Sequence, residues 1–169
     1  MKNTGVQLLR FVLFIAAQVL VFNRINLGGS INPYIYILFL LMLPFDSPGW
    51  LQLIIAFLLG LSIDLFTHTP GLHTSAAVLV AFARPFIVRM ISTSREIEPG
   101  MRPTLFIMGT RWYFLYSLML IVLHHVYLFL LESMTFNRFF VTLTQALSSA
   151  AITFFLAFLS QYLFYYKKN

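Results

Sequence analysis

A single carboxylate, Asp64, lies within the apolar stretch GLSIDLFTHTPGLH at residues 60–73. An acid in these surroundings serves as a proton relay, a substrate anchor, a metal ligand or a structural staple. Ala56, Gly60 and Asp64 follow one another at four-residue intervals, so on a helix they share one face. Small residues on such a face favour close packing of helices in lipid. We therefore expect Asp64 to point into the protein.

The chain that follows Asp64 favours the staple. Thr69 and Pro70 are typical of a helix start, with threonine as the N-cap and proline as the first helical residue. The unpaired N–H groups of residues 71–73 then lie close to the acid, at the positive end of the helix dipole. A hydrogen bond to a charged group contributes roughly 1.5–3 kcal/mol. We predict that Asp64 joins two helices in this way, with a proton or ion site as the alternative.

One arginine, Arg84, also lies within an apolar segment. It shares a helix face with Ala77 and Ala81, and Pro85 follows it. A direct pair with Asp64 is not expected, because Arg84 lies roughly 10 Å nearer the other end of the hairpin at 1.5 Å per residue. The alternative is a side chain that extends to the lipid headgroups.

The four histidines do not form a metal-binding pattern. His68 and His73 flank a turn, whereas His124 and His125 are adjacent in another apolar segment. Adjacent residues on a helix point about 100° apart, and no pair is spaced at four residues, as a helical chelate requires. We interpret these side chains as hydrogen-bonded packing histidines and predict no metal site.

The last apolar segment carries a stripe of small and polar residues at four-residue intervals. We expect this stripe to form a helix–helix seam with interhelical hydrogen bonds rather than a solute path. Its members are Gln145, Ser149, Thr153, Ala157 and Gln161. The sequence contains no nucleophile paired with a base and no phosphate-binding loop, and Glu96 and Glu98 fall in a loop beside arginines. We therefore expect no catalytic residue, no cofactor and no enzymatic activity.

The composition identifies the solvent around these residues. The chain has 169 residues, of which 60% are hydrophobic and 9% charged, whereas soluble domains contain about 25% charged residues. This predicts one integral membrane domain over residues 1–169, built as an all-α bundle. The net charge of +6 comes from scattered basic residues, which do not form the basic patch of a nucleic-acid-binding protein. There is no cysteine, so disulfides and thiolate metal sites are excluded.

Apolar length and punctuation predict about six transmembrane helices. The second candidate is short, since ten residues reach about 15 Å along a helix and the hydrocarbon core is about 30 Å thick. It is therefore either a short crossing helix or a half-span. Asn32–Pro33, Ser47–Pro48 and Thr69–Pro70 are each expected to begin a helix. The expected spans are residues 6–22, 34–43, 49–66, 72–91, 112–131 and 139–165.

The basic residues predict the orientation. With six crossings and a cytoplasmic N-terminus, seven Lys and Arg residues lie inside and two, Arg24 and Arg138, lie outside, as the positive-inside rule favours. Both termini are then cytoplasmic, as is the basic stretch STSREIEPGMRPTLFIMGT at residues 92–110. The turn THTPG at residues 67–71 is then external. A re-entrant second segment leaves the seven-to-two division unchanged.

Two stretches together resemble the MreD family of bacterial rod-shape-determining membrane proteins. They are NPYIYILFLLMLPFDSPGW at residues 32–50 and GLSIDLFTHTPGLHTSAAVLVAFARP at residues 60–85, and the shared pattern includes Gly60, Asp64, Pro70 and Gly71. The resemblance implies a non-enzymatic scaffold of the wall elongation machinery in the bacterial inner membrane, in complex with the single-span protein MreC. It also implies a six-helix fold similar to the substrate-binding S components of energy-coupling vitamin transporters, and it brings no catalytic residues.

The alternative function is an S-component-like subunit for uptake of a small solute such as a vitamin. The first helix of such components tends to present an Ala-x-x-x-Ala face to the energising subunit. Here Ala16 is followed directly by Ala17, with no alanine four residues away. Retention of a vitamin-sized molecule on purification favours uptake, whereas recovery with a single-span protein favours a scaffold.

Overall fold

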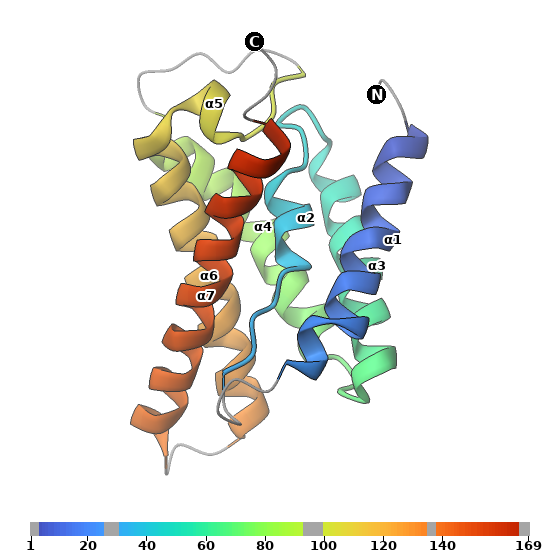
Figure 1. Cartoon of the computed structure of the whole chain (residues 1–169), viewed down its shortest axis with the longest axis vertical. Helices are drawn as coiled ribbons and strands as arrows, with labels where there is room; N and C mark the ends of the chain where they lie inside the picture. The colour runs from blue at the N-terminus through green and yellow to red at the C-terminus, as the bar shows by residue number, and fades with distance from the viewer. Residues whose placement is uncertain (1–3, 26–30, 93–99, 135–137, 166–169) are drawn as a thin grey trace.

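The computed structural model describes residues 4–25, 31–92, 100–134 and 138–165, and it is helical throughout most of this length (Figure 1). The helices begin and end where apolar runs meet proline, glycine or polar residues. The elements are α1 (Thr4–Leu20), η1 (Phe22–Arg24), α2 (Ile37–Leu41), α3 (Gly49–Thr67), α4 (Leu72–Ile91), α5 (Leu105–Met108), α6 (Thr110–Ser133) and α7 (Phe139–Tyr165).

Five of the described helices are long and apolar enough to cross a membrane: α1 together with η1, and α3, α4, α6 and α7. This length and composition identify a multi-pass membrane protein with an all-helical bundle. The expected spans 72–91 and 139–165 have the bounds of α4 and α7, and the expected span 49–66 differs from α3 by one residue. The apolar pattern alone therefore located the spanning helices.

The second expected span is wrong as a ten-residue helix over residues 34–43. Only α2, with five residues, is α-helical there, and it is preceded by non-helical chain at residues 31–36. Asn32–Pro33 does not begin a helix, because the N–H groups of the following residues are bound by side chains of other helices. Every residue from Tyr34 to Leu41 is buried. This segment, residues 31–43, is here termed the central segment.

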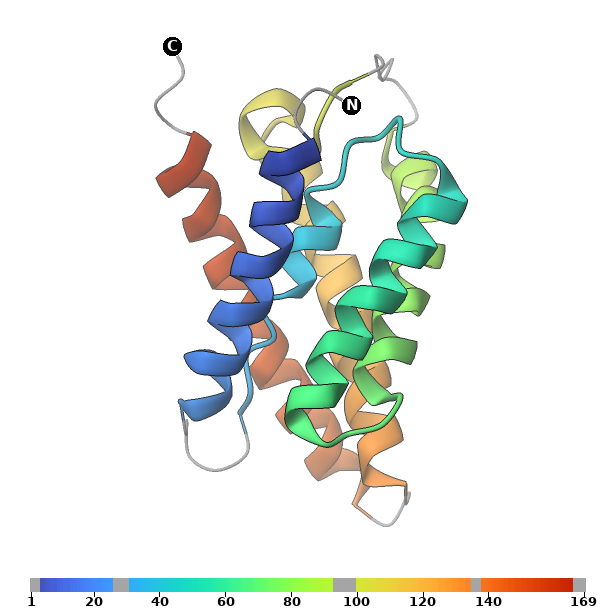
Figure 2. The ribbon, with the colours of Figure 1, turned by 90° about the vertical axis from the view of Figure 1, so that its right-hand side faces the viewer.

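The helices surround the central segment (Figures 1 and 2). Helices α1 and α3 run in the same direction, so the chain between them returns from one end of the bundle to the other. Helix α4 packs between α3 and α6, and α7 packs on α6. Helix α2 contacts α1, α4 and α6, and its side chains form part of the apolar core. The start of α1 and the end of α7 lie at the same end of the bundle.

At the other two predicted helix starts, the proline does not occupy the first helical position. Helix α3 begins at Gly49, with Pro48 as its N-cap, one residue later than predicted from Ser47–Pro48. Helix α4 begins at Leu72, and Pro70 lies in the turn before it instead of in the first helical position. The N-cap is Gly71, whose φ of 86° suits a residue without a side chain. Helix α5 was not predicted.

Candidate functional site

The Asp64 carboxylate accepts five hydrogen bonds from the turn after α3 and the first turn of α4. The hydroxyl of Thr69 and the N–H of His73 donate to Oδ1, both at 3.0 Å. Oδ2 accepts from the N–H of Gly71 at 3.1 Å and from the N–H and hydroxyl of Thr74 at 2.9 and 2.6 Å. All five contacts come from N–H or hydroxyl groups, so a carboxylate oxygen is the acceptor in each of them.

The predicted hydrogen bonds of Asp64 to residues 71–73 are confirmed at two of the three positions. Gly71 and His73 donate to the acid, whereas the N–H of Leu72 donates to the Thr69 carbonyl oxygen at 3.2 Å. Thr74, one residue beyond the predicted range, supplies two further donors. The N-terminal N–H groups of α4 lack carbonyl partners in their own helix, so the carboxylate satisfies them.

Gly60 sets the distance between α3 and α4 at the same place. A side-chain Cβ atom on Gly60 would lie 2.4 Å from the Thr74 Cα atom and 2.7 Å from the His73 carbonyl oxygen. Real Cβ atoms do not approach backbone this closely, so only glycine fits here. Ala56, Gly60 and Asp64 are all buried, which confirms that they share an inward face. Together, Gly60 and Asp64 fix how α3 and α4 pack.

Arg84 is buried, with 2% of its surface exposed. Its Nε donates to the Tyr116 hydroxyl at 2.7 Å and its Nη1 to Oε1 of Gln52 at 2.8 Å. Its Nη2 donates to the carbonyl oxygen of Leu43. The expected absence of a direct bond to Asp64 is therefore confirmed. The alternative, in which the side chain extends to the headgroups, is wrong because the guanidinium finds its acceptors inside the bundle.

Arg84 and its partners hold the end of the central segment. The Tyr116 hydroxyl donates to the Leu41 carbonyl oxygen at 2.9 Å. The carbonyl group of the last residue of α2 and that of Leu43, two residues later, therefore have donors from α6 and α4. A helix end leaves such carbonyls without partners in the helix. The guanidinium also lies 5.7 Å from the centre of the Phe45 ring, within the range of a cation–π contact.

Side chains of α1 and α7 bind the non-helical start of the central segment. Gln18 accepts from the N–H groups of Ile35 and Tyr36 at 2.7 and 3.4 Å. Its amide nitrogen donates to the Pro33 carbonyl oxygen at 3.2 Å. The N–H of Tyr34 donates to the hydroxyl oxygen of Thr153 at 3.1 Å. Non-helical backbone at membrane depth is stable only where the protein supplies such partners.

The polar stripe of α7 therefore has a different main role from the predicted helix–helix seam. Ser149 accepts from the N–H of Asn32 at 3.0 Å, and Gln161 accepts from the N–H of Leu105 at 3.2 Å. The predicted bond between two spanning helices also occurs, between Thr153 and Nε2 of His125 on α6, at 3.0 Å. Ala157 is fully buried and Gln145 half-buried. The stripe mainly satisfies backbone N–H groups that lie outside the spanning helices.

Three of the four histidines converge in the core. The Tyr36 hydroxyl lies 3.1 Å from Nδ1 of His73 and 2.6 Å from Nε2 of His124. Nδ1 of His125 lies 2.8 Å from the Ile121 carbonyl oxygen, and His68 is exposed at the end of α3. Within the described ranges no group of three or more His, Cys, Asp or Glu side chains is placed to hold a metal ion. The geometry is that of packing histidines joined by a tyrosine.

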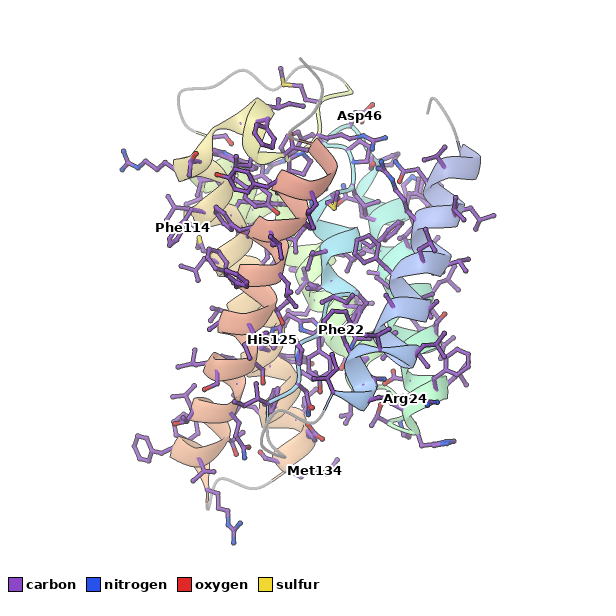
Figure 3. All side chains as sticks on the ribbon, viewed as in Figure 1. Phe22, Arg24, Asp46, Phe114, His125 and Met134 are labelled. Atoms are coloured by element: carbon purple, nitrogen blue, oxygen red, sulfur yellow. The ribbon has the colours of Figure 1, made fainter. Side chains whose placement is uncertain are left out.

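A mainly polar cavity of about 450 Å³ opens beside this cluster, between the ends of α1, α3 and α6 and the start of α4. We term it the polar cavity. Arg24 lies at the end of the molecule opposite Asp46, and the labelled His125 lies between these two ends (Figure 3). The cavity has a buried floor and an exposed, charged rim. Its polar lining residues include Arg24, Asn32, Tyr34, Thr69, His73 and Glu132.

Sequence reasoning missed Gln18, Tyr36, Gln52 and Tyr116, which carry much of this buried hydrogen bonding. A signal existed for the two glutamines, because each is an isolated amide within an apolar helix. Such groups are buried only where they find partners. The tyrosines had no such signal, since their rings suit both lipid interfaces and cores.

Comparison with known proteins found no matching protein-family model, no matching curated protein and no matching solved structure.

Proposed function

We propose that this chain is a non-enzymatic membrane scaffold of the MreD family, which acts in bacterial wall elongation and cell shape through a complex with MreC in the inner membrane. The polar cavity is the observation that carries the proposal. It presents Arg24 and Glu132, two exposed and oppositely charged side chains, around a floor that includes Tyr34 and His73. An arrangement of this kind suits the polar chain of a protein partner as it leaves the membrane.

The hydrogen bonds of the buried polar groups support a structural role for these residues. Both oxygens of Asp64 are occupied by donors from α4 and the preceding turn. The guanidinium of Arg84 is likewise occupied by Tyr116, Gln52 and Leu43. These groups maintain the packing of the helices around the central segment. Of the residues that the sequence singled out, Gly60, Asp64, Gly71 and Arg84 therefore act in the scaffold by shaping it, with Pro70 in the turn between α3 and α4.

The proposed topology has six crossings and cytoplasmic N- and C-termini. Five crossings are the long helices, and the sixth is the central segment, in the manner of an S-component-like fold. The parallel directions of α1 and α3 support this count. Cysteines introduced at Asp46 and at His68, which are both exposed, should react with an impermeant thiol reagent from the cytoplasmic and the external side, respectively. Labelling of both positions from one side contradicts the topology.

The test of the partner is co-purification with full-length MreC from the same cells. We expect charge reversal at the cavity rim, Arg24→Glu or Glu132→Lys, to lower MreC recovery by about tenfold or more, the equivalent of 1.4 kcal/mol. The matched control is Arg138→Glu, which reverses an exposed charge at the start of α7 outside the cavity lining. Depletion of the chain should round the cells. Unchanged recovery in both rim variants contradicts the proposed use of the cavity.

The cavity also favours the second candidate, a subunit for small-solute uptake. Its volume of about 450 Å³ is within the range of about 300–1,000 Å³ that small-molecule sites occupy. Purification under native conditions followed by mass spectrometry of the released small molecules distinguishes the two functions. A stoichiometric vitamin-sized molecule, lost in Tyr34→Phe or His73→Gln but present in Arg138→Glu, supports uptake. Recovery of MreC with an empty cavity supports the scaffold.

A further inference from the structure

A second cavity, of about 420 Å³, lies on the side of the bundle between α1 and α7. We term it the lateral groove. Its floor is the central segment, which is visible between α1 and α7 in Figure 1. The lining is apolar apart from Arg10 and Ser160. A cavity of this composition on the flank of a membrane protein faces hydrocarbon rather than water.

Each wall of the groove is one face of a helix. Arg10, Leu13, Phe14 and Ala17 line it from α1, and Leu156, Leu159, Ser160 and Leu163 line it from α7. Both sets follow the spacing i, i+3, i+4, i+7 of a single helical stripe. Two complete stripes thus face a space that neither helix fills.

Helix α1 is less buried within the protein than the other four spanning helices are. In its most apolar stretch 6% of the residues are buried, against 28–44% in the other four spanning helices. The α1 wall therefore lacks protein neighbours across the groove. Atoms on both walls lack dispersion contacts when the space is empty. An apolar occupant supplies these contacts and so stabilises the position of α1.

The length of the groove identifies the occupant as a lipid chain. From Arg10 to Phe22 the α1 side extends about 18 Å at 1.5 Å per residue, and the α7 side from Leu156 to Leu163 about 10 Å. A transmembrane partner helix requires about 30 Å of continuous surface, whereas one leaflet is about half of that. The lateral groove matches the depth of a single leaflet.

Arg10 identifies the headgroup. Arg10 is the only charged side chain among the described residues that line the groove, and it lies in the second turn of α1, at the N-terminal end of the α1 wall. A guanidinium binds phosphate oxygens through paired N–H donors. We propose that the lateral groove binds one anionic phospholipid, with an acyl chain between α1 and α7 and its phosphate on Arg10.

The experiment measures lipid binding to the full chain. The protein is reconstituted in nanodiscs that contain equal amounts of dioleoyl phosphatidylglycerol and dioleoyl phosphatidylcholine, released into mild detergent, and analysed by native mass spectrometry. We expect one retained lipid per chain, predominantly phosphatidylglycerol. Ala17→Trp fills the groove and should reduce retention of both lipids by about tenfold, equivalent to 1.4 kcal/mol. Arg10→Gln should abolish the preference for phosphatidylglycerol while a lipid is still retained.

Two matched variants control for bulk and for charge. Val12→Trp adds the same side chain on the exposed, opposite face of α1, and Arg89→Gln removes an exposed arginine of α4 outside the groove lining. Both should bind lipid as the parent protein does, and circular dichroism with thermal melting verifies that all four variants fold. Parent-like retention by Ala17→Trp overturns the proposal. Equal loss of headgroup preference in Arg89→Gln and Arg10→Gln also overturns it, as does displacement of the lipid by a co-purified partner helix that crosslinks to Leu13 and Leu159.

Discussion

Thr74 donates two hydrogen bonds to the same oxygen of Asp64, one from its backbone N–H at 2.9 Å and one from its hydroxyl at 2.6 Å. With Thr69, Gly71 and His73, it surrounds both carboxylate oxygens with donors. The acid therefore connects the end of α3 to the turn and to the first turn of α4, and each substitution at position 64 changes a definite number of these bonds.

Asp64→Asn is expected to lower stability, and Asp64→Leu to lower it further. Asparagine keeps one acceptor oxygen, but it carries an amide nitrogen in place of the other. In the structure its amide nitrogen must face N–H or hydroxyl donors whichever way it is turned, so we expect a loss of roughly 1.5–3 kcal/mol. Leucine leaves all five donors without an acceptor and should exceed about 3 kcal/mol. Thermal melting in detergent measures both.

The control for these two variants is Asp46→Asn, which removes an exposed carboxylate at the opposite end of the molecule. It should melt as the parent protein does. If Asp64→Asn also melts as the parent protein does, the five-donor arrangement around Asp64 does not contribute to stability.

Gly60→Ala is expected to destabilise the hairpin of α3 and α4. The new methyl group would lie 2.4 Å from the Thr74 Cα atom, and because that atom is backbone, the two helices must separate. Overpacking of this kind typically costs about 1–3 kcal/mol. Gly49→Ala is the matched control, since a Cβ atom there has no neighbour within 4 Å. Equal unfolding midpoints for the two variants in a denaturant titration contradict the close approach.

Arg84→Lys is expected to be destabilising even though it keeps the positive charge. The guanidinium binds Gln52, Tyr116 and the Leu43 carbonyl oxygen through three different nitrogens, and a lysine ammonium has no such planar fork. Loss of bonds to a buried charge costs about 3–5 kcal/mol. Arg89→Lys, on the exposed face of the same helix, should have no effect on the melting temperature. Similar melting temperatures of the two variants argue against a stabilising role for the three hydrogen bonds of Arg84.

Gln18→Leu is expected to loosen the central segment. The substitution is apolar and of similar size, yet it leaves the N–H groups of Ile35 and Tyr36 without their acceptor. Each unsatisfied buried group costs about 1–3 kcal/mol. Amide hydrogen exchange followed by mass spectrometry should show faster exchange over residues 34–36. Gln7→Leu, nearer the start of α1, serves as the control and should leave exchange there unchanged.

The sequence by itself determined which segments are helices that suit a membrane, because apolar length and proline or glycine punctuation act locally. It also determined the Asp64 staple, because the acid and its donors are separated by at most 10 residues. A turn between two helices brings residues that are this close in sequence into contact. The positions of Gly60 and Asp64 on one face followed from helical spacing alone.

The tertiary structure decided the partners of Arg84 and the conformation of the central segment. Arg84 bonds to residues 32 and 41 positions away in the chain, and the N–H of Tyr34 bonds to Thr153, 119 positions away. Residues 34–43 are apolar enough to predict a helix by pattern. The N–H groups of residues 34–36 take side-chain acceptors from α1 and α7 instead, and only the packing of those helices brings the acceptors within reach.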